Sequence, residues 1–545
     1  MGKYTVGIDF GTLSGRCVVV DCRDGRELAE AVCEYPHGVM DAELPCGKKL
    51  PAHYALQHPG DYLQVLQVAV PEAVKKAGVS PAEVTGVGID FTASTLLPVD
   101  KQGTPLCMLP EYTSEPHAYV KLWKHHAAQP QADAINRLAD ARQEKWLANC
   151  GGKISSEWAL PKILEVLQKA PGIYAETARF MEAADWLVST LIGAEIHSNA
   201  FASYKALYFE GDYPSNDFMT ALDAGLDGVV GTKLSRNIAD VSTAAGTLCP
   251  RGAELLGLPV GVPVAVPQID AHAAMPALQI TGVGEMMVIM GTSSCHIVNS
   301  VSGDPVKGIC GYVKDGVIPG LYSYEAGQSA VGDIFDWFVK NQVPAAYEAE
   351  AQHRGISVHV LLTEKAEKLA VGESGLLALD WHNGNRSVLD DSELSGLIVG
   401  LTLRTKPEEI YRALLEATAF GAKMIIDNLE KSRVTINGLK VAGGIAHKNP
   451  MLMQIYADVL NREICLCQST QTGALGSAIY AAVAAKVYPD MQTAAAAMGA
   501  PVVKTYTPNP ENHRAYEKLY ADYVQLHDYF GKGGNNVMKR LLGKV

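Results

Sequence analysis

The start of the chain is built from short apolar runs separated by tight turns, a pattern typical of β-strands. Residues 4–10, 16–21 and 27–34 are predicted strands, because each run is short and follows or precedes a glycine-containing turn. An amphipathic pattern over residues 61–77 predicts a helix, and the nearly continuous apolar run 84–91 predicts a buried strand. Hairpins combined with helix-flanked buried strands indicate an α/β domain with a mixed sheet.

The second half of the chain repeats this opening pattern. Residues 286–290 form an apolar run that leads into Gly-Thr-Ser-Ser, and a second run follows at 296–300. The glycines of the two Gly-Thr turns, Gly11 and Gly291, are 280 positions apart, which is about half the chain. This spacing predicts a duplicated domain. Two short turns can also agree by chance, and an aspartate, Asp9, precedes the first turn but not the second.

Helical patterns dominate the last part of the chain. The predicted elements are helices at residues 407–431, 449–460, 471–486 and 511–530 and a strand at 440–444. The helix at 471–486 is rich in small residues, which predicts close packing. We expect two domains, residues 1–280 and 281–545.

Composition narrows the classes of function. The chain has 545 residues, 48% of them hydrophobic, and a net charge of −13, so nucleic acid is an unfavourable partner. The eleven cysteines lack a CxxC pair and are odd in number, which favours reduced thiols. The first residues enter a strand pattern directly, and no apolar run approaches the ~20 residues of a membrane helix. We expect a cytoplasmic protein with no membrane partner; its oligomeric state is open, with a homodimer as one alternative.

The first strand–turn–strand carries a candidate phosphate and metal site. Its candidate residues are Asp9, Gly11, Thr12, Ser14 and Arg16. The turn exposes backbone N–H groups and hydroxyls that can contact phosphate oxygens, while the aspartate can hold Mg²⁺, usually through water. The alternative is an ordinary glycine-rich hairpin, which the combination of carboxylate, hydroxyls and guanidinium makes less favourable.

Two further motifs follow in the middle of the chain. Gly291, Thr292 and Ser293 form a second turn that can contact a triphosphate, although by itself it is equally an ordinary hairpin. Asp270 follows an apolar strand and precedes small residues that leave room for a substrate. A carboxylate there can accept the proton of a hydroxyl that receives a phosphoryl group. Zinc binding by Asp270 and His272 is disfavoured, because further ligands are missing from the sequence pattern, and His272 is expected to pack or hydrogen-bond.

The fourth motif is a strand that ends in two glycines before a helix. Gly443 and Gly444 allow a flat ring to lie against the backbone, and Asn449 begins the next helix. This is a candidate adenine site, and a plain strand–loop–helix connection is the alternative. The sequence has no GxxxxGK[ST], GxGxxG, GxSxG or HExxH motif, which removes the usual support for P-loop, nicotinamide, hydrolase and zinc-protease functions.

Taken in order, these four motifs resemble the FGGY family of carbohydrate kinases, within the superfamily of actin, hexokinase and heat-shock ATPases. The resemblance covers essentially the whole chain and implies an α/β fold with two actin-like (ribonuclease H-like) domains and a nucleotide cleft between them. The run Gly396-Leu397-Ile398-Val399-Gly400-Leu401, with Glu409-Ile410 and Leu415-Glu416 after it, is similar to the family's C-terminal signature, from which Leu414 departs. The N-terminal signature, Lys-apolar-x-Trp, is matched poorly by residues 162–165, which have glutamate in place of tryptophan.

Within the family the chain is most similar to the branch that phosphorylates L-ribulose. The segments that carry this similarity are residues 90–93, 122–128, 152–158, 204–206, 270–273 and 324–333. The resemblance implies ATP-dependent conversion of L-ribulose to L-ribulose 5-phosphate, as in L-arabinose catabolism, with Mg²⁺. A small-molecule sugar and ATP are therefore the expected partners.

The resemblance also assigns roles to individual residues. It implies Asp270 as the general base and a sugar site that comprises the Ala93 carbonyl, Trp123, Lys205, Asp270 and Glu325. An indole and an ammonium group donate hydrogen bonds to sugar oxygens, and carboxylates accept them from hydroxyls. Without the resemblance, Trp123 would be taken as a half-buried core aromatic and Lys205 as a solvated surface charge. Gly332 matches a family glycine near the nucleotide, and Gly443, Gly444 and Asn449 match the adenosine site.

Three alternatives stay open at this point. One is a family member that acts on another ketose or polyol, such as D-ribulose, xylulose or ribitol, by the same chemistry. A second is an actin-like or chaperone-like ATPase, which would hydrolyse ATP without sugar. A third, a catalytically inactive sugar sensor, is disfavoured because Asp9, Thr12 and Asp270 are all present.

Overall fold

The computed structural model describes residues 3–469 and 471–543, which belong to two compact units. The first unit comprises Met1–Thr281, Tyr312–Ser323 and Gln471–Ala500. The second comprises Gly282–Gly311, Tyr324–Thr470 and Pro501–Val545. Two segments of the first unit therefore come after the boundary expected at residues 280/281, and these compact units are not continuous stretches of chain.

The first unit is organised around a mixed β-sheet. Its strands are β1 (Tyr4–Phe10), β2 (Ser14–Asp21), β3 (Glu27–Glu34), β5 (Val84–Phe91), β11 (Ala244–Thr247), β12 (Pro263–Ala265) and β13 (Gln268–Ile269). The order is β11-β12-β5-β1-β2-β3, with β13 also paired to β5. Strand β1 runs antiparallel to β2 and parallel to β5, as the hairpins and the buried strand at residues 84–91 predict.

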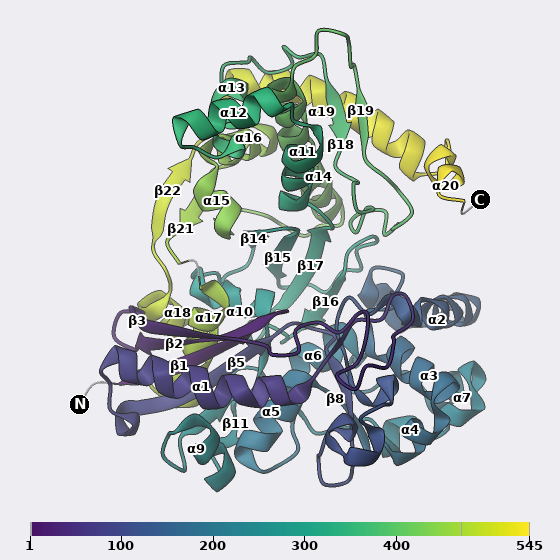
Figure 1. Cartoon of the computed structure of the whole chain (residues 1–545), viewed down its shortest axis with the longest axis vertical. Coiled ribbons are helices and arrows are strands. Elements are labelled where there is room, and N and C mark those ends of the chain that lie inside the picture. Colours follow the sequence, from purple (N-terminus) through teal and green to yellow (C-terminus); the bar gives the residue numbers. More distant parts are fainter. Residues whose placement is uncertain (1–2, 470, 544–545) are drawn as a thin grey trace. The chain divides into compact units, whose positions relative to one another are not determined.

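Helices cover both faces of this sheet. Helix α1 (Pro59–Ala77) lies along β2 and β3 (Figure 1), and its Tyr62 meets the ring of Phe10 edge-on, 6.1 Å between centroids. Side chains alternate between the two faces of a strand, so Gly7 lies on the face opposite Phe10. On that face the sheet packs against α17 (Thr472–Ala484), which in turn packs against α10 (Asp270–Ala277).

Glycines in the sheet allow α17 to approach at backbone distance. Gly7 of β1 and Gly88 of β5 are register partners. A Cβ atom on Gly7 would lie 1.8 Å from the carbonyl oxygen of Ala474, and one on Gly88 would lie 1.9 Å from that of Ser477. The small-residue helix predicted at 471–486 does pack closely, and this packing is the reason that residues 471–500 belong to the first unit.

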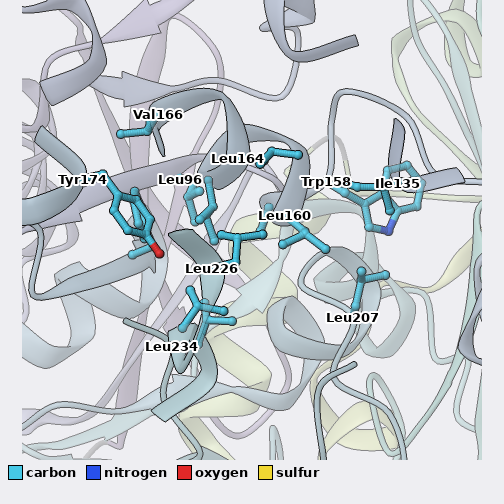
Figure 2. Close-up of a cluster of buried hydrophobic side chains, with 14 of the residues drawn as sticks. Leu96, Ile135, Trp158, Leu160, Leu164, Val166, Tyr174, Leu207, Leu226 and Leu234 are labelled. Atoms are coloured by element: carbon cyan, nitrogen blue, oxygen red, sulfur yellow. The ribbon is translucent and has the colours of Figure 1, made fainter. Parts of the chain in front are cut away.

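The first unit also contains a smaller sheet with its own helices. Its strands are β4 (Leu56–Gln57), β7 (Val120–Lys121), β6 (Leu96–Val99) and β8 (Arg179–Glu182), in that order. The apolar core beside it is formed by side chains such as Leu96, Leu160 and Leu164 (Figure 2). The associated helices are α2 (Gln129–Arg142), α3 (Ala159–Lys169), α4 (Pro171–Glu176), α7 (Asn216–Leu222) and α8 (Val229–Thr232).

The second unit repeats the strand arrangement around β1. Its main sheet is formed by β16 (Gly311–Lys314), β17 (Tyr322–Gln328), β15 (Ser294–Ser300), β14 (Glu285–Met290), β20 (Gly438–Ala442), β21 (Ile464–Cys467) and β22 (Val502–Tyr506), in that order. Strand β14 runs antiparallel to β15 and parallel to β20, as β1 does with β2 and β5. Strand β20 ends at Ala442, two residues before the predicted end, because Gly443 turns the chain into a short helix.

The helices beside this sheet include the long helix predicted at residues 407–431. They are α11 (Gly332–Gln342), α12 (Ala345–Arg354), α13 (Val358–Ala366), α14 (Pro407–Lys431), α15 (Gly444–Lys448), α16 (Pro450–Leu460), α19 (Pro510–Gly531) and α20 (Val537–Leu541). Further helices and strands of the chain are α5 (Ala183–Ile192), α6 (Asn199–Lys205), α9 (Pro250–Leu256), α18 (Met491–Met498), β9 (His197–Ser198), β10 (Ile238–Ala239), β18 (Leu377–Leu379) and β19 (Leu397–Val399). Within the part of the chain that the structure describes, no helix combines the length and apolar character needed to span a bilayer.

Candidate active site

Three aspartates stand at one edge of the first unit's sheet. Asp9 is the penultimate residue of β1, Asp90 is the penultimate residue of β5, and Asp270 directly follows β13. Asp9 and Asp90 are register partners, and Asp90 is also the partner of Gln268 in β13. Because the carboxyl ends of parallel strands meet at the same edge of a sheet, the fold brings these three carboxyl groups to one place.

Asp90 is a residue of this edge that we did not assign a role from the sequence. Its side chain is fully buried, and the hydroxyl of Ser477 donates to Asp90 Oδ2 at 2.6 Å. Burial, and then the charge of Asp9, hold the pKa of Asp90 well above its usual range, while the Ser477 hydrogen bond opposes the shift. A repeat in the sequence could have revealed Asp90. Residues 6–10 and 87–91 are both Val-Gly-Ile-Asp-Phe, and the two segments pair one to one in the sheet.

The first Gly-Thr turn is fixed by hydrogen bonds to its backbone. The N–H of Gly11 donates to the carbonyl of Ser14 at 3.0 Å. The Tyr35 hydroxyl donates to the Gly11 carbonyl at 3.0 Å, and the Gln57 amide donates to the Thr12 carbonyl at 2.7 Å. The turn is therefore held in one conformation from outside, as a preorganised anion site requires.

Asp9 and Arg16 face each other across the β1–β2 pair. They are register partners, and Arg16 Nε lies 3.4 Å from Asp9 Oδ2. Burial raises the pKa of Asp9, and the neighbouring guanidinium opposes that shift. Arg16 Nη1 also donates to Gln471 Oε1 at 3.2 Å, just before α17. The five residues expected at this phosphate and metal site, Asp9 to Arg16, therefore lie in one turn and its two flanking strands.

Two of the expected sugar-binding residues lie beside this turn or beside strand β5. Trp123 is 39% exposed, and its indole Nε1 donates to Thr12 Oγ1 at 3.3 Å. Ala93 follows β5 by two residues and is half-buried. The next residue, Ser94, has a positive φ of 60°, which is uncommon for a residue with a side chain.

Lys205 and Asp270 belong to helices that pack against each other. Lys205 ends α6, is buried, and places its ammonium 4.7 Å from the centre of the Trp158 ring. The preceding residue, Tyr204, packs its ring against the buried ring of His272 on α10, 4.4 Å between centroids. Asp270 begins α10, and its Oδ1 accepts the N–H of Ala271 at 2.6 Å. His272 thus has the packing role expected from the sequence.

The second Gly-Thr turn is tied to the start of α11. The N–H of Gly291 donates to the Ser293 carbonyl at 2.9 Å. The carbonyl of Gly291 accepts the N–H of Gly332 at 3.1 Å, and the carbonyl of Thr292 accepts the N–H of Val331 at 2.7 Å. Gly332 is the first residue of α11, so the second unit brings Gly332 to the Gly291–Ser293 turn.

Gly443 reaches the same turn from β20. Its φ of 104° favours glycine, and a Cβ atom there would lie 2.2 Å from the carbonyl oxygen of Met290. Gly444 begins α15, and a Cβ atom on it would meet no described heavy atom within 4 Å, so a flat ligand has room there. Asn449 lies beyond α15 and caps α16, because its Oδ1 accepts the N–H of Leu452 at 3.0 Å.

Glu325, the remaining residue expected to bind sugar, belongs to the second unit. It lies in β17 with only 7% of its side chain exposed. Its Oε1 is 3.3 Å from Nη2 of Arg386, a residue that we did not single out from the sequence. Arg386 orients this carboxylate, and the long sequence separation left no local pattern to reveal the pair.

A group of potential metal ligands lies around the start of α1. Within residues 3–469 and 471–543, the side chains of His37, His58 and Asp61 lie close enough together to share a metal ion. Their donor atoms already form hydrogen bonds at the start of α1: His37 Nδ1 with Asp61 Oδ1 at 2.7 Å, and His58 Nδ1 with the N–H of Gly60 at 3.1 Å. We therefore interpret this group as the N-terminal cap of α1.

Comparison with known proteins identifies the family. Residues 4–275 match the N-terminal domain, and residues 286–485 the C-terminal domain, of the FGGY family of carbohydrate kinases. A ribulokinase of Halalkalibacterium halodurans is 52% identical, with 99% of this chain and 97% of the relative covered. A ribulokinase of Mycolicibacterium smegmatis is 51% identical, with 99% and 96% covered.

Solved structures agree with this at the level of the fold. The xylulose kinase of Rhodospirillum rubrum has a TM-score of 0.79 at 20% identity, over 96% of this chain and 98% of that one. The glycerol kinase of Plasmodium falciparum, solved with ADP, has a TM-score of 0.74 at 17% identity, over 96% and 98%. The chain belongs to the FGGY family of carbohydrate kinases. The predicted family and the predicted α/β fold with two actin-like domains are confirmed, and membership implies a sugar acceptor and ATP as the donor.

Proposed function

We propose that this protein transfers the γ-phosphoryl group of ATP to L-ribulose, giving ADP and L-ribulose 5-phosphate. The observation that carries this proposal is the identity of 52% to a ribulokinase over 99% of the chain. At this identity, a shared acceptor sugar is better supported than a change of specificity. The activity of an actin-like or chaperone-like ATPase, hydrolysis without sugar, is not favoured by any of the named relatives.

The proposed sugar site combines donors and acceptors of the kinds that a ketose requires. The Trp123 indole and the Lys205 ammonium donate to sugar oxygens, while the Ala93 carbonyl, Asp270 and Glu325 accept from hydroxyls. Lys205 is held against Trp158 and Glu325 against Arg386, so both charged groups are oriented before the sugar binds. Such preorganisation reduces the entropy that binding costs.

The proposed nucleotide contacts come from turns and helix starts. In the first unit they are Gly11, Thr12, Ser14 and Arg16, and in the second unit Gly291, Thr292, Ser293, Gly332, Gly443, Gly444 and Asn449. Gly332 is the first residue of α11, and its N–H is bonded to the Gly291 carbonyl, so its proposed role is to leave space beside the phosphate turn rather than to donate to phosphate. The absence of a Cβ at Gly332 and Gly443 lets two strand ends and a helix start meet closely.

In the proposed mechanism Asp270 is the general base. The 5-hydroxyl oxygen of the sugar attacks the γ-phosphorus, the bond from that phosphorus to the bridging oxygen breaks, and ADP leaves. The hydroxyl proton passes to the Asp270 carboxylate as the new bond forms. The N–H of Ala271 holds this carboxylate at the start of α10. Arg16 and the Gly-Thr turns stabilise the charge that spreads over the phosphoryl oxygens.

A Mg²⁺ site at Asp9 fits the residues present. The Asp9 side chain is 18% exposed beside the phosphate turn, and the fully buried Asp90 lies next to it in the sheet. A partly exposed carboxylate can bind a hydrated Mg²⁺ through water. When bound, Mg²⁺ would neutralise charge on the phosphate oxygens. Asp9 is therefore the residue we assign to hold the metal.

A cytoplasmic location is also proposed. All eleven cysteines are free thiols in the structure, most of them buried, as is usual for proteins of the reducing cytoplasm, where the ATP that a carbohydrate kinase uses is available. The buried thiols act as small apolar side chains of the core.

A sugar panel tests the proposed function. The purified protein is incubated with ATP, Mg²⁺ and each of L-ribulose, D-ribulose, xylulose and ribitol, and ADP release is followed by a coupled assay. We expect the highest kcat/KM for L-ribulose and little ADP release without sugar. A higher kcat/KM for another sugar would replace L-ribulose as the substrate, and sugar-independent hydrolysis would overturn the kinase assignment.

A further inference from the structure

The backbone next to the proposed sugar contact Ala93 adopts a conformation that needs support. Ser94 has a φ of 60°, in the left-handed region, where a Cβ atom crowds the following carbonyl. Such a conformation persists in a folded protein when surrounding contacts determine it, and it is concentrated at functional sites. The contacts that hold Ser94 therefore also decide where the Ala93 carbonyl lies.

Two buried charged side chains supply those contacts. Lys162 is fully buried, and its Nζ donates to the Ser94 carbonyl at 2.5 Å. Glu182 is 4% exposed, and its Oε2 accepts the N–H of Thr95 at 2.8 Å. Burial lowers the pKa of Lys162 and raises that of Glu182, and the attraction between the two charges opposes both shifts. Charge-assisted hydrogen bonds of this kind are stronger than neutral ones.

The same ammonium group reaches the segment that carries Trp123. Lys162 Nζ donates to the Leu122 carbonyl at 3.1 Å and lies 3.4 Å from the Lys121 carbonyl. One buried side chain thus joins the backbone after Ala93 to the backbone just before Trp123. These are two of the proposed sugar contacts in the first unit, and they are separated by thirty positions in the sequence.

Helix α3 directs a second charged residue toward the Trp123 segment. Glu165, one turn after Lys162, accepts from Lys121 Nζ at 2.9 Å, and its Oε2 lies 2.9 Å from His125 Nε2. Lys121 and His125 flank Trp123 on either side in the sequence. Leu160 and Leu164 of the same helix point into the apolar core (Figure 2), so α3 is buried on two faces. Glu165 stands where the family signature has tryptophan, which accounts for the poor match at residues 162–165.

We propose that Lys162, supported by Glu182, is a positioning residue for the sugar: it holds the Ala93–Thr95 turn and the Trp123 segment in the arrangement that binds the ketose. The proposal rests on the proposed function, because it takes Ala93 and Trp123 to be sugar contacts. Lys162 does not act on the nucleotide in this account. Its loss should therefore affect the sugar far more than ATP.

The test compares Lys162→Met with a matched control, Arg412→Met. Arg412 is a buried cation of the second unit that also donates to two backbone carbonyls, those of Ala366 and Leu369. We expect Lys162→Met to raise the KM for L-ribulose at least tenfold, with the KM for ATP within twofold of the wild type. Arg412→Met should leave the KM for L-ribulose within twofold, even if it lowers the thermal unfolding temperature as much as Lys162→Met does.

A second substitution separates positioning from general stability. Glycine adopts positive φ without a Cβ penalty, so Ser94→Gly should lower the raised KM for L-ribulose of Lys162→Met at least threefold. If Lys162→Met does not fold, the milder Glu182→Gln variant takes its place, with an expected rise of about threefold that Ser94→Gly reverses.

Three results would overturn the proposal: an unchanged KM for L-ribulose in Lys162→Met, an equal rise in the KM for ATP, or no recovery with Ser94→Gly. A wild-type protein that does not phosphorylate L-ribulose would contradict the proposed function instead. The same comparison would then be made with the sugar of the panel that the wild type does phosphorylate.

Discussion

The indole N–H of Trp123 donates to the hydroxyl of Thr12 across 3.3 Å. One of these residues is proposed to bind the sugar and the other the phosphate chain, so a single hydrogen bond within the first unit connects the two functions. A sugar hydroxyl that accepts from Trp123 would compete with Thr12 for the same proton. Binding of the sugar would then leave the Thr12 hydroxyl available to a phosphate oxygen.

Trp123→Phe removes this donor while keeping an aromatic ring. A neutral hydrogen bond contributes about 1 kcal/mol net, so we expect the KM for L-ribulose to rise about fivefold. Because Trp123 is 39% exposed, the thermal unfolding temperature should change little. The measurement is steady-state kinetics with varied L-ribulose at saturating ATP.

Trp146→Phe is the matched control for this experiment. The Trp146 indole also donates a hydrogen bond, to Glu144 Oε2 at 3.1 Å, but neither residue belongs to the proposed site. Its KM for L-ribulose should equal that of the wild type. Equal KM values for the two variants would remove Trp123 from the sugar site.

Asp9→Asn tests the proposed metal residue. Replacing the carboxylate by an amide removes the negative charge that attracts the hydrated cation, so the Mg²⁺ concentration for half-maximal rate should rise at least tenfold. The KM for L-ribulose should stay within twofold. Asp24→Asn, which changes an exposed aspartate of a hairpin turn, is the control and should leave the Mg²⁺ dependence unchanged. An unchanged Mg²⁺ dependence in Asp9→Asn would mean that another group holds the metal.

Gly7→Ala tests the close approach of α17 to the sheet. The new methyl group would overlap the Ala474 carbonyl oxygen, so the strand and the helix must separate. We therefore expect the free energy of unfolding to fall by about 3 kcal/mol or more. Thermal unfolding followed by circular dichroism measures this. Gly172→Ala in α4, whose Cβ would meet no described heavy atom within 4 Å, should change stability by less than about 1 kcal/mol. Similar stabilities of the two variants would contradict the packing described for Gly7.

His197 makes a contribution to stability that depends on pH. Burial alone would lower the pKa of His197, but hydrogen bonds to the carboxylates of Asp185 and Glu195 outweigh it and raise the pKa to about 9. A raised pKa stabilises the fold fully below the unfolded-state value of about 6.5, and that contribution is lost as the pH rises through 9. The stability difference between wild type and His197→Gln should therefore shrink by up to about 3 kcal/mol between pH 6.5 and pH 9.

Unfolding curves of both proteins between pH 6 and pH 9.5 measure this difference. A difference that stays constant across the range would show that His197 is not charged in the folded protein. Measurements on each protein alone would not suffice, because other groups also titrate there.

Local patterns in the sequence predicted the elements that carry most of the candidate site. The Asp9–Arg16 hairpin and the Gly291–Ser293 turn were both predicted, because turn residues and hydrophobic periodicity act over a few positions, whereas helix α10, which begins at Asp270, was not predicted. The close-packing character of the helix at 471–486 was also predicted. The sheet against which this helix packs was not predicted, because the glycines that allow the close contact lie in strands far away in the sequence.

Residues that act through distant contacts were missed. Asp90 repeats the Val-Gly-Ile-Asp-Phe pattern of β1, and a comparison of these two strands would have found it. Lys162 and Glu182 carry no such pattern, since their importance depends on where the Ser94 and Thr95 backbone lies in three dimensions. Lys162 stands between the apolar pairs Leu160-Pro161 and Ile163-Leu164, which was the available signal, and it was attributed to a poor signature match.

The most direct test of the whole account measures L-ribulose 5-phosphate and ADP together, by phosphorus NMR and a coupled assay, for the wild type and Asp270→Asn. We expect the wild type to form one ADP per sugar phosphate. Asp270→Asn should lose about 10²–10⁴-fold in kcat while its affinity for ATP stays within twofold. A wild type that forms ADP without L-ribulose 5-phosphate, or an Asp270→Asn variant with near-normal kcat, would contradict the account.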